Sequence, residues 1–569
     1  MNYYILLDND EEIEDYSYEF AAVGAAIGGG FDHTSELIPK KYKEAMMGPD
    51  RDKWVESVEK EHERMVQDGV FKVVDAREAT KRGQKAITST WTMKKKSDGT
   101  YRARLVARGF QQQEGLHYDI AAISSPVTSD TSIRMVLTIM AVAGYAARVI
   151  DVKAAFLKGE LENNEEIYMK IPEGFEKFYP KQNSWLQIKK PIYGLKQSGL
   201  YYYRKAKRAM QINGFERSEA DPCLFYAWRN EGLVIWVTWV DDNMVIAPPN
   251  IVDREKDMMK NHFECDDLGN MTEYIGCKIE RSNTSRAIKI TQPVLVQSLK
   301  DEFDLPDGVP PTTPAKPGTT ITKQPEEEPL NAEKHTNYRA GIGKLQHLVR
   351  NSRPDIGNAV RELSRQLVRP TNSHYQAMLT TMKYVVSTPN RGIVLNPTGT
   401  WNGKDKDFVW IIKGRCDSNY ATNPDDRKSV SGTQVFLNDS PIMAKSSTQK
   451  VITLSVTEAE LYAATSCAQD MLFVYRLMRT LDMKVQLPMI LECDNKGTID
   501  LSRNWSVGGR TRHVDVRLYM LRDLNEDKII QMKWVKGEQN SADLGTKNLD
   551  HASHAKHTKT LCGDNDENF

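Results

Sequence analysis

Residues 232–247 read Gly-Leu-Val-Ile-Trp-Val-Thr-Trp-Val-Asp-Asp-Asn-Met-Val-Ile-Ala, two apolar runs interrupted by Asp241, Asp242 and Asn243. This pattern predicts a hairpin of two strands with its turn at the Asp/Asn cluster. Charge is costly to bury among Val, Trp and Ile unless a cation compensates it. Asp and Asn are also the expected residues of a solvated turn, and this stretch alone favours the turn.

A third carboxylate changes that balance. Asp151 ends a strand-like run and leads into Val-Lys-Ala-Ala-Phe156. Three carboxylates can hold two Mg²⁺ ions roughly 3.5–4 Å apart, the arrangement used for in-line phosphoryl transfer. One ion would lower the pKa of an attacking hydroxyl, and the other would stabilise a leaving pyrophosphate. Asp151, Asp241 and Asp242 are therefore candidate metal ligands.

Two basic segments lie on either side of Asp151 in the sequence. Residues 81–110 hold nine Lys and Arg residues against one acid, and residues 186–210 hold seven against none. Over the whole chain, 77 Lys and Arg balance 77 Asp and Glu, which excludes a globally basic protein. The segments predict a phosphate-binding face, and the alternative is a solvated basic surface.

Length and cysteine content limit the remaining classes. The 569 residues predict about three to five domains. The seven cysteines are scattered without C-x-x-C spacing, so we expect reduced thiols, an intracellular protein and no zinc ribbon. No stretch is long enough to span a bilayer, and no membrane partner is expected.

A second group of acids falls within residues 408–550, where strand-like and helical runs alternate and predict an α/β domain. Each acid lies at the end of a predicted element and has a structural explanation of its own, such as capping a helix. Only as a set do they suggest a common function. The four acids are Asp417, Glu460, Asp494 and Asp543.

Four motifs in order carry a family resemblance. They are Tyr101-Arg-Ala-Arg-Leu-Val-Ala-Arg-Gly-Phe110, Asp151-Val-Lys-Ala-Ala-Phe156, Ile192-Tyr-Gly-Leu-Lys-Gln-Ser198 and Trp239-Val-Asp-Asp242. Together they resemble the reverse transcriptase of copia-type (Ty1/copia, Pseudoviridae) LTR retrotransposons. The resemblance implies an α+β right-hand polymerase with fingers, palm and thumb. It makes the three aspartates the metal ligands of the palm, and it departs from the family at Trp239, where Tyr is usual.

The same resemblance assigns nucleotide-binding residues. It implies that Phe156 is a steric gate that stacks under the deoxyribose and excludes a 2′-hydroxyl. It places Lys96, Arg102 and Arg104 near the incoming triphosphate. It places Gly194, Lys196 and Gln197 beside the templating base pair.

The C-terminal half resembles a copia-type ribonuclease H domain. The motifs are Cys416-Asp-Ser-Asn-Tyr-Ala421, Asp425-Asp-Arg-Lys-Ser-Val-Ser-Gly432, Thr457-Glu-Ala-Glu460, Asp494-Asn495, Arg512-His-Val-Asp-Val-Arg517 and Ala542-Asp543. The resemblance implies a strand–helix layered fold whose four acids hold two Mg²⁺ and cleave the RNA strand of an RNA–DNA hybrid. Glu460 is preferred over Glu458 as the helix-borne ligand. For His513, a role beside the hybrid and a purely structural role stay open.

These resemblances divide the chain into seven expected regions. They are a tail or truncated linker (1–40), fingers and palm (41–250), a thumb-like region (251–305), a Pro-rich linker (306–337), a helical connection (338–400), a ribonuclease H-like domain (408–550) and a polar tail (551–569). The cations of the connection, Arg350, Arg353, Arg361, Arg365 and Arg369, could follow a hybrid backbone or form solvated helix faces.

The expected function is RNA-directed DNA polymerisation with hybrid-specific ribonuclease activity. The expected cofactor is Mg²⁺, two ions per active site, with Mn²⁺ as an alternative. The expected partners are an RNA template, RNA–DNA hybrid, DNA and deoxynucleoside triphosphates. Two other functions remain open: a non-enzymatic nucleic-acid-binding relic, and a hybrid-specific nuclease whose polymerase half is only a binding platform. No protease, integrase or Gag-like motif is found, so we expect the C-terminal portion of a polyprotein or a decayed copy, in virus-like particles or the nucleus.

Overall fold

The computed structural model describes residues 41–95, 99–120, 123–161, 165–179, 183–305, 308–503 and 515–563. These residues form two compact units. We call the described residues of 41–128 and 146–271 the first unit, and those of 129–145 and 272–563 the second unit. No helix of the described ranges is long and apolar enough to cross a membrane.

The first unit contains a six-stranded sheet, as far as its residues are described. Its strand order is β12-β5-β11-β10-β9-β8. The predicted hairpin is confirmed, but its turn is Val240-Asp241, so Asp242 already belongs to the second strand. The strands are β5 (Ala146–Val152), β8 (Glu216–Arg217), β9 (Leu224–Arg229), β10 (Gly232–Trp239), β11 (Asp242–Ala247) and β12 (Cys265–Asn270).

One face of this sheet is covered by helices whose apolar side chains point inward. Tyr202, Ala206 and Met210 of α6 (Ser198–Ile212) are buried with Trp236 and Val245 of the sheet. α7 (Val252–Asp257) and η6 (Met258–Asn261) complete the cover. Side chains alternate between the two faces along a strand, so Asp242 points away from the helix-covered face on which Val245 lies. Asp151 is paired directly with Asp242 and points the same way, so both acids lie on the opposite face.

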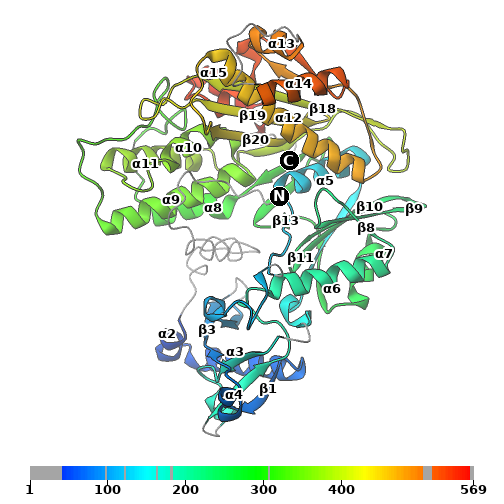
Figure 1. Ribbon diagram of the computed structural model, residues 1–569, viewed down its shortest axis with the longest axis vertical. Coiled ribbons are helices and arrows are strands. Elements are labelled where there is room, and N and C mark those ends of the chain that lie inside the picture. Colours follow the sequence, from blue (N-terminus) through cyan, green and yellow to red (C-terminus); the bar gives the residue numbers. More distant parts are fainter. Residues whose placement is uncertain are drawn as a thin grey trace. The chain divides into compact units, whose positions relative to one another are not determined.

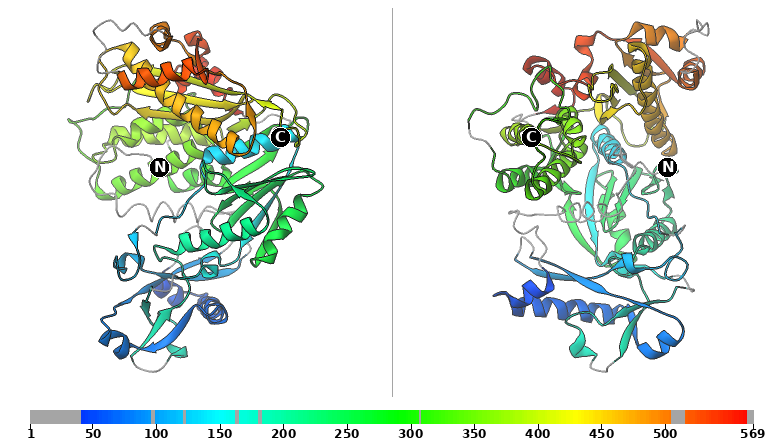
Figure 2. Two further views of the ribbon diagram at one scale, coloured as in Figure 1. Left: turned by 45° about the vertical axis from the view of Figure 1, so that its right-hand side comes forward. Right: turned by 60° about the vertical axis from the view of Figure 1, so that its left-hand side comes forward.

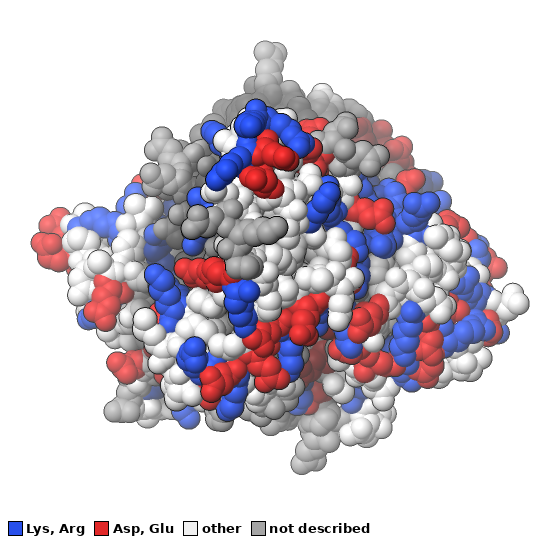
Figure 3. All heavy atoms as spheres, turned by 90° about the horizontal axis from the view of Figure 1, so that it is seen from below, with Lys and Arg blue, Asp and Glu red and all other residues white. Residues whose placement is uncertain are grey.

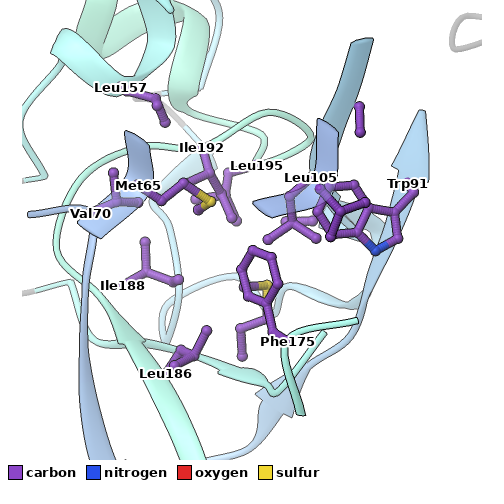
Figure 4. Close-up of a cluster of buried hydrophobic side chains, with 14 of the residues drawn as sticks. Met65, Val70, Trp91, Leu105, Leu157, Phe175, Leu186, Ile188, Ile192 and Leu195 are labelled. Carbon is purple, nitrogen blue, oxygen red and sulfur yellow. The ribbon is translucent and has the colours of Figure 1, made fainter. Parts of the chain in front are cut away.

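The rest of the first unit is a smaller α+β region with its own core (Figure 4). Met65, Trp91, Leu105, Phe175 and Leu186 are buried together in it. Its elements are α2 (Tyr42–Met47), α3 (Arg51–Gln67), β1 (Phe71–Asp75), α4 (Ala76–Lys81), β2 (Ala86–Ile87), β3 (Ser89–Lys95), β4 (Tyr101–Ala107), η2 (Gly109–Gln111), β6 (Ile167–Lys170), η5 (Glu176–Phe178) and β7 (Ser184–Ile188). β3 and β4 pair as antiparallel strands, and residues 96–98 between them lie outside the described residues.

The second unit contains a helical bundle whose helices lie side by side (Figures 1 and 2). Its core is built from residues such as Tyr338, Leu345, Leu363 and Met382. The helices are α8 (Pro293–Glu302), α9 (Ala332–Asn351), α10 (Gly357–Ser364) and α11 (Asn372–Ser387). The expected linker 306–337 is therefore shorter than predicted: the side chain of Asn331 caps α9, which starts at Ala332.

An α/β layer completes the second unit. Its sheet has the order β20-β19-β18-β22-β23, with α12 along one face (Figure 1). β20 forms an antiparallel hairpin with β19. Our sequence analysis did not predict β20. The elements are β17 (Val409–Trp410), β18 (Ile412–Asn419), β19 (Val430–Leu437), β20 (Ser440–Thr448), α12 (Val456–Thr480), β21 (Lys484–Val485), β22 (Met489–Cys493), α13 (Lys496–Arg503), α14 (Asp515–Glu526) and β23 (Ile530–Trp534).

Three expected boundaries differ from the structure. The thumb-like region 251–305 is divided, because β12 pairs with β5 in the first unit and residues from Thr272 onward join the second. The helix α5 (Asp130–Ala143), expected within the fingers and palm, also belongs to the second unit.

The third difference concerns the expected polar tail, 551–569. Residues 551–563 are folded, because α15 (His551–Thr558) buries His554 and His557, and β24 (Cys562–Gly563) pairs with β16 (Gly392–Leu395). These two strands end a sheet that also holds β13 (Glu273–Tyr274), β14 (Cys277–Arg281) and β15 (Ile288–Thr291).

Candidate active sites

The first acidic cluster lies where three adjacent chain segments of the first unit meet. Asp242 stands directly opposite Asp151 in the β11–β5 register. Asp241 occupies the hairpin turn, and its carbonyl accepts a hydrogen bond of 2.9 Å from the amide of Val152. The three aspartates that were predicted from separate parts of the sequence are therefore brought together.

The pKa shifts of these carboxylates show that they repel one another. Burial, followed by the charges of Asp241 and Asp151, raises the pKa of Asp242 to about 7. Burial and Asp241 also raise the pKa of Asp151, while Arg102 and Arg104 act in the opposite direction. Carboxylate oxygens are the ligands that Mg²⁺ prefers, so this donor set fits a divalent cation that would relieve the repulsion.

The turn itself is strained. Val240 has φ 52°, a left-handed conformation that a β-branched residue rarely adopts. The side chain of Asn243 helps to hold the turn, because its Nδ2 donates to the carbonyl of Asp241 at 2.9 Å. The strained residue thus lies directly before the acid that the hairpin presents.

Two arginines of β4 face the acidic cluster. Arg102 and Arg104 are two residues apart on a strand, so they share one face. Burial and the neighbouring Arg104 lower the pKa of Arg102, whereas Asp151 and Asp241 raise it. The two guanidinium groups therefore create a positive surface beside the carboxylates, as predicted for a triphosphate site.

Phe156 lies beside this surface in η4 (Ala155–Lys158). The turn into η4 uses Ala154 at φ 51°, a left-handed residue directly before the short helix. The ring of Phe156 packs edge-on against Tyr193, with centroids 5.1 Å apart and planes at 75°. Our sequence analysis gave Tyr193 no role, although it lies within the quoted motif 192–198.

The structure gives different contacts to the other residues that were predicted to bind the nucleotide or the templating base pair. The side chain of Gln197 is fully buried and bonds to Gln112, to the carbonyl of His117 and to Glu165, so it holds loops together. The Nζ of Lys196 donates to Tyr118 Oη at 2.8 Å. Lys96 lies outside the described residues.

Gly194 explains how the loop 191–197 fits against β4. It has φ 88°, and a Cβ there would lie 2.1 Å from the carbonyl oxygen of Ala107. The amide of Ala107 donates to the carbonyl of Tyr193 at 2.7 Å. Only glycine allows this approach, and it fixes Tyr193 against the strand that carries Arg102 and Arg104.

Figure 3 shows one face of the molecule with its charged side chains coloured by sign. Lys and Arg side chains there alternate with Asp and Glu side chains. Lys205 of the second segment, for example, lies 3.8 Å from Glu160. Arg102 and Arg104 are half-buried, which limits the screening of their charges by salt.

The second acidic cluster is built by the α/β layer of the second unit. β18 and β22 are parallel neighbours, which places Asp417 beside the residue that follows β22, Asp494. Glu460 reaches in from α12, where its Oε1 accepts from the amide of Ser418 at 3.1 Å. Asp543 comes from η10 (Ser541–Gly545). The four acids predicted from the sequence thus converge.

Repulsion and burial act here as in the first cluster. Burial and the charge of Asp494 raise the pKa of Glu460 to about 7. Burial also raises the pKa of Asp417, with Asp543 and Glu460 adding to it and Lys547 opposing them. Carboxylate oxygens of Glu460 and Asp494, with the Cys493 sulfur, lie within 4.8 Å of one another, so this donor set also fits a cation.

Lys547 is the residue that our sequence analysis missed at this site. Its Nζ lies 2.7 Å from Asp543 Oδ1 and 3.3 Å from Asp417 Oδ2. Lys547 lies just beyond the end of η10, and its position four residues after Asp543 is the only feature of the local sequence that relates it to the site. It partly neutralises two of the four carboxylates.

The choice between the two glutamates of α12 is supported by their contacts. Glu458 accepts from the amide of Leu454 at 2.6 Å at the start of the helix, a capping contact. Glu460 instead points into the cluster, and its side chain is buried. His513 lies outside the described residues.

The cations of the helical connection mostly serve the fold. Arg353 is completely buried in a two-pronged ion pair with Asp355, both contacts at 2.9 Å. Arg361 bonds to Ser446 at 3.0 Å, and Arg365 to Asp426 at 2.9 Å. For Arg353, both of the predicted roles are wrong, because it reaches neither a bound strand nor solvent.

Comparisons with known proteins agree with these motifs. A family model described as "Reverse transcriptase (RNA-dependent DNA polymerase)" matches residues 69–317. The Pol polyprotein of transposon TNT 1-94 from Nicotiana tabacum is 31% identical over 520 residues, which is 90% of this chain and 38% of that protein. The Pol polyprotein of transposon RE1 from Arabidopsis thaliana is 30% identical over 464 residues, 81% of this chain and 30% of that protein. The chain thus spans less than half the length of these curated relatives.

Among solved structures, a foamy viral protease-reverse transcriptase in complex with double-stranded DNA covers 85% of this chain and 70% of its own, with 10% identity. Its TM-score of 0.43 is too low to add to the assignment, which rests on the sequence matches. Through residues 69–317 and the similarity that extends over most of its length, the chain belongs to the reverse transcriptases of Ty1/copia-type retrotransposons.

Proposed function

We propose that the chain is an RNA-directed DNA polymerase that also cleaves the RNA strand of RNA–DNA hybrids. The observation that carries the proposal is the convergence of Asp151 and Asp242 on one face of a sheet, with Asp241 in the adjoining turn, beside two half-buried arginines. The TNT 1-94 and RE1 relatives are Pol polyproteins of retrotransposons, and residues 69–317 match the family model described as an RNA-dependent DNA polymerase. These support nucleic acid as the partner of this chain.

In the polymerase reaction, the three aspartates would hold two Mg²⁺ ions, with Mn²⁺ as a substitute. Bound divalent ions supply activation of the primer 3′-hydroxyl and neutralisation of the leaving pyrophosphate. Arg102 and Arg104 would bind the triphosphate of the incoming deoxynucleotide through charge-assisted hydrogen bonds. Phe156 would pack beneath its deoxyribose and leave no room for a 2′-hydroxyl.

In the nuclease reaction, Asp417, Glu460, Asp494 and Asp543 would hold the second pair of ions. Divalent ions bound there supply an activated water for attack on the scissile phosphate. Two of these acids are already bonded to Lys547, which would keep Asp417 and Asp543 aligned while substrate enters. The nuclease role is the weaker half of the proposal, because the matched family model ends at residue 317.

Primer extension on poly(rA)–oligo(dT) with Mg²⁺ tests the polymerase. We expect incorporation by the wild-type chain and a loss of at least about a thousandfold in Asp241→Asn, because metal-borne charge stabilisation is removed. Asp257→Asn is the matched control, since Asp257 is exposed and pairs only with lysines of its own helical segment. Folded wild-type protein that incorporates nothing would support the nucleic-acid-binding relic instead.

Cleavage of a labelled RNA–DNA hybrid tests the nuclease on the same preparations. Asp494→Asn should abolish cleavage and leave primer extension intact, whereas the exposed control Asp500→Asn should change neither. If only cleavage is found, and Asp241→Asn changes nothing, the first unit is a binding platform. If cleavage survives in Asp494→Asn, the second acidic cluster is not a nuclease site.

A further inference from the structure

Tyr193 lies between the two kinds of nucleotide contact proposed for the first unit. The edge of its ring system meets Phe156, with ring centroids 5.1 Å apart and planes at 75°. The guanidinium of Arg104 lies over the Tyr193 ring, with Cζ 4.8 Å from the centroid. One side chain thus contacts both the aromatic gate and an arginine of the triphosphate surface.

Arg104 has few other contacts to fix it. Its Nε is buried and has no hydrogen-bond partner among the described residues. The neighbouring Arg102 carries the same charge, and their mutual repulsion favours movement apart. A cation over the face of an aromatic ring is attracted by the quadrupole of that ring, so Tyr193 supplies the main orienting contact for the Arg104 guanidinium.

The ring of Tyr193 is itself held in place. The carbonyl of Tyr193 accepts from the amide of Ala107 at 2.7 Å, next to the strand segment that carries Arg104. The following residue, Gly194, packs directly onto the Ala107 carbonyl. The charges around the hydroxyl are mixed: burial, Asp241 and Glu61 raise the pKa of Tyr193, whereas Arg104 and Arg102 lower it. The backbone contact therefore fixes the ring without requiring its hydroxyl.

We propose that Tyr193 is a positioning residue that sets both deoxynucleotide affinity and sugar discrimination, through Arg104 and Phe156 respectively. This inference rests on the polymerase function proposed above and names a determinant of its substrate choice. The aromatic ring, not the hydroxyl, carries the role. Without the ring, Arg104 loses its orientation and Phe156 can turn away from the position of a 2′-hydroxyl.

Single-nucleotide incorporation of dTTP and UTP by wild type, Tyr193→Phe and Tyr193→Leu tests the inference. For Tyr193→Leu we expect the KM for dTTP to rise about tenfold with kcat within threefold, the size of effect that one cation–π contact provides. The preference for dTTP over UTP should fall by about tenfold. Tyr193→Phe should stay within threefold of wild type in both. Tyr203→Leu, which removes another tyrosine of the first unit, should leave the discrimination unchanged.

Three results would overturn the inference: wild-type values in Tyr193→Leu, equal damage in Tyr193→Phe, or a fall in kcat without a change in KM or discrimination. Hydrogen exchange of peptides from β10 and β11 reports on the folding of the first unit, and Tyr193→Met fills the volume if the leucine variant aggregates. The double variant Tyr193→Leu/Arg104→Gln should raise the KM no further than Arg104→Gln alone. If the wild type incorporates nothing, the proposed function fails. The role of Tyr193 can then still be tested by measuring dTTP binding to the protein–primer–template complex in Ca²⁺. Tenfold weaker binding in Tyr193→Leu would support the role of Tyr193, and equal binding would refute it.

Discussion

Asp242→Asn is expected to stabilise the metal-free protein, although it should destroy polymerase activity. Burial and two neighbouring aspartates raise the pKa of Asp242 from an ordinary 3.8 to about 7. The folded chain then keeps a proton that the unfolded chain releases, so this group costs stability as the pH rises from 3.8 to 7. An asparagine has the same shape and cannot ionise, and it therefore avoids the cost.

The magnitude follows from this pKa difference. One pKa unit corresponds to about 1.36 kcal/mol, which gives an upper bound of about 4 kcal/mol at pH 8. At pH 5 only the lower part of the interval has been crossed, and the bound is about 1.6 kcal/mol. Since three carboxylates share the site and water enters it, we expect Asp242→Asn to gain about 1–3 kcal/mol more at pH 8 than at pH 5.

Thermal unfolding with EDTA at pH 5 and pH 8 measures this difference, and hydrogen exchange of peptides from β10 and β11 reports on the first unit alone. Asp266→Asn is the matched control: Asp266 stands opposite Asp151 in β12, but its side chain is 55% exposed and pairs with Lys153. Mg²⁺ should stabilise the wild type more than Asp242→Asn, because only the wild type keeps all three ligands. The reasoning is refuted if Asp242→Asn gains nothing at pH 8, or gains the same at both pH values.

Three further predictions concern the fold and the second site. Gly194→Ala should cost about 3 kcal/mol in unfolding free energy, since it combines a positive φ with a backbone clash. Gly214→Ala is the control and should cost about 1 kcal/mol, because Gly214 also has a positive φ but its nearest neighbour is 3.6 Å away. Similar costs for the two variants would contradict the close-approach explanation. Arg353→Met should cost about 3–5 kcal/mol, because it leaves the buried Asp355 unpaired, and denaturant unfolding that shows less than about 1 kcal/mol would contradict this. Glu460→Gln should abolish hybrid cleavage, and wild-type cleavage should fall on the acid side of pH 7 because protonated Glu460 binds a divalent ion poorly; a rate that is flat from pH 8 to pH 6 would contradict the role of Glu460.

The sequence predicted the fold and the candidate site best where acidic residues end or interrupt an apolar run with strand or helix periodicity. The run 232–247 predicted the hairpin, and its aspartates could be linked to Asp151 because each follows or interrupts an apolar strand. The α/β alternation after residue 408 likewise predicted most elements that carry Asp417, Glu460, Asp494 and Asp543. The turn was misplaced by one residue because Val240 adopts a left-handed conformation that its side chain disfavours.

Other features depend on tertiary contacts that no local pattern reveals. Residues 551–563 are polar in sequence, yet His554 is buried. Its Nε2 forms a hydrogen bond of 3.0 Å with the carbonyl of Asp355, a residue far away in the chain. Arg353 was assigned a surface role from its charge; its partner Asp355 is only two residues away, but the burial of the pair and the contact of Arg353 with the carbonyl of Thr388 come from the tertiary fold. Tyr193 and Lys547 were missed because a single tyrosine or lysine gives no periodic signal, and their roles come from the partners that folding brings to them.

The central claim is that two separate acidic clusters bind catalytic divalent ions. Anomalous diffraction from crystals soaked in Mn²⁺ locates such ions directly. The account predicts one set of peaks bridging Asp151 with Asp241 and Asp242, and a second set among Asp417, Glu460, Asp494 and Asp543. Crystals that contain Mn²⁺ elsewhere but show no peak at either cluster would contradict it.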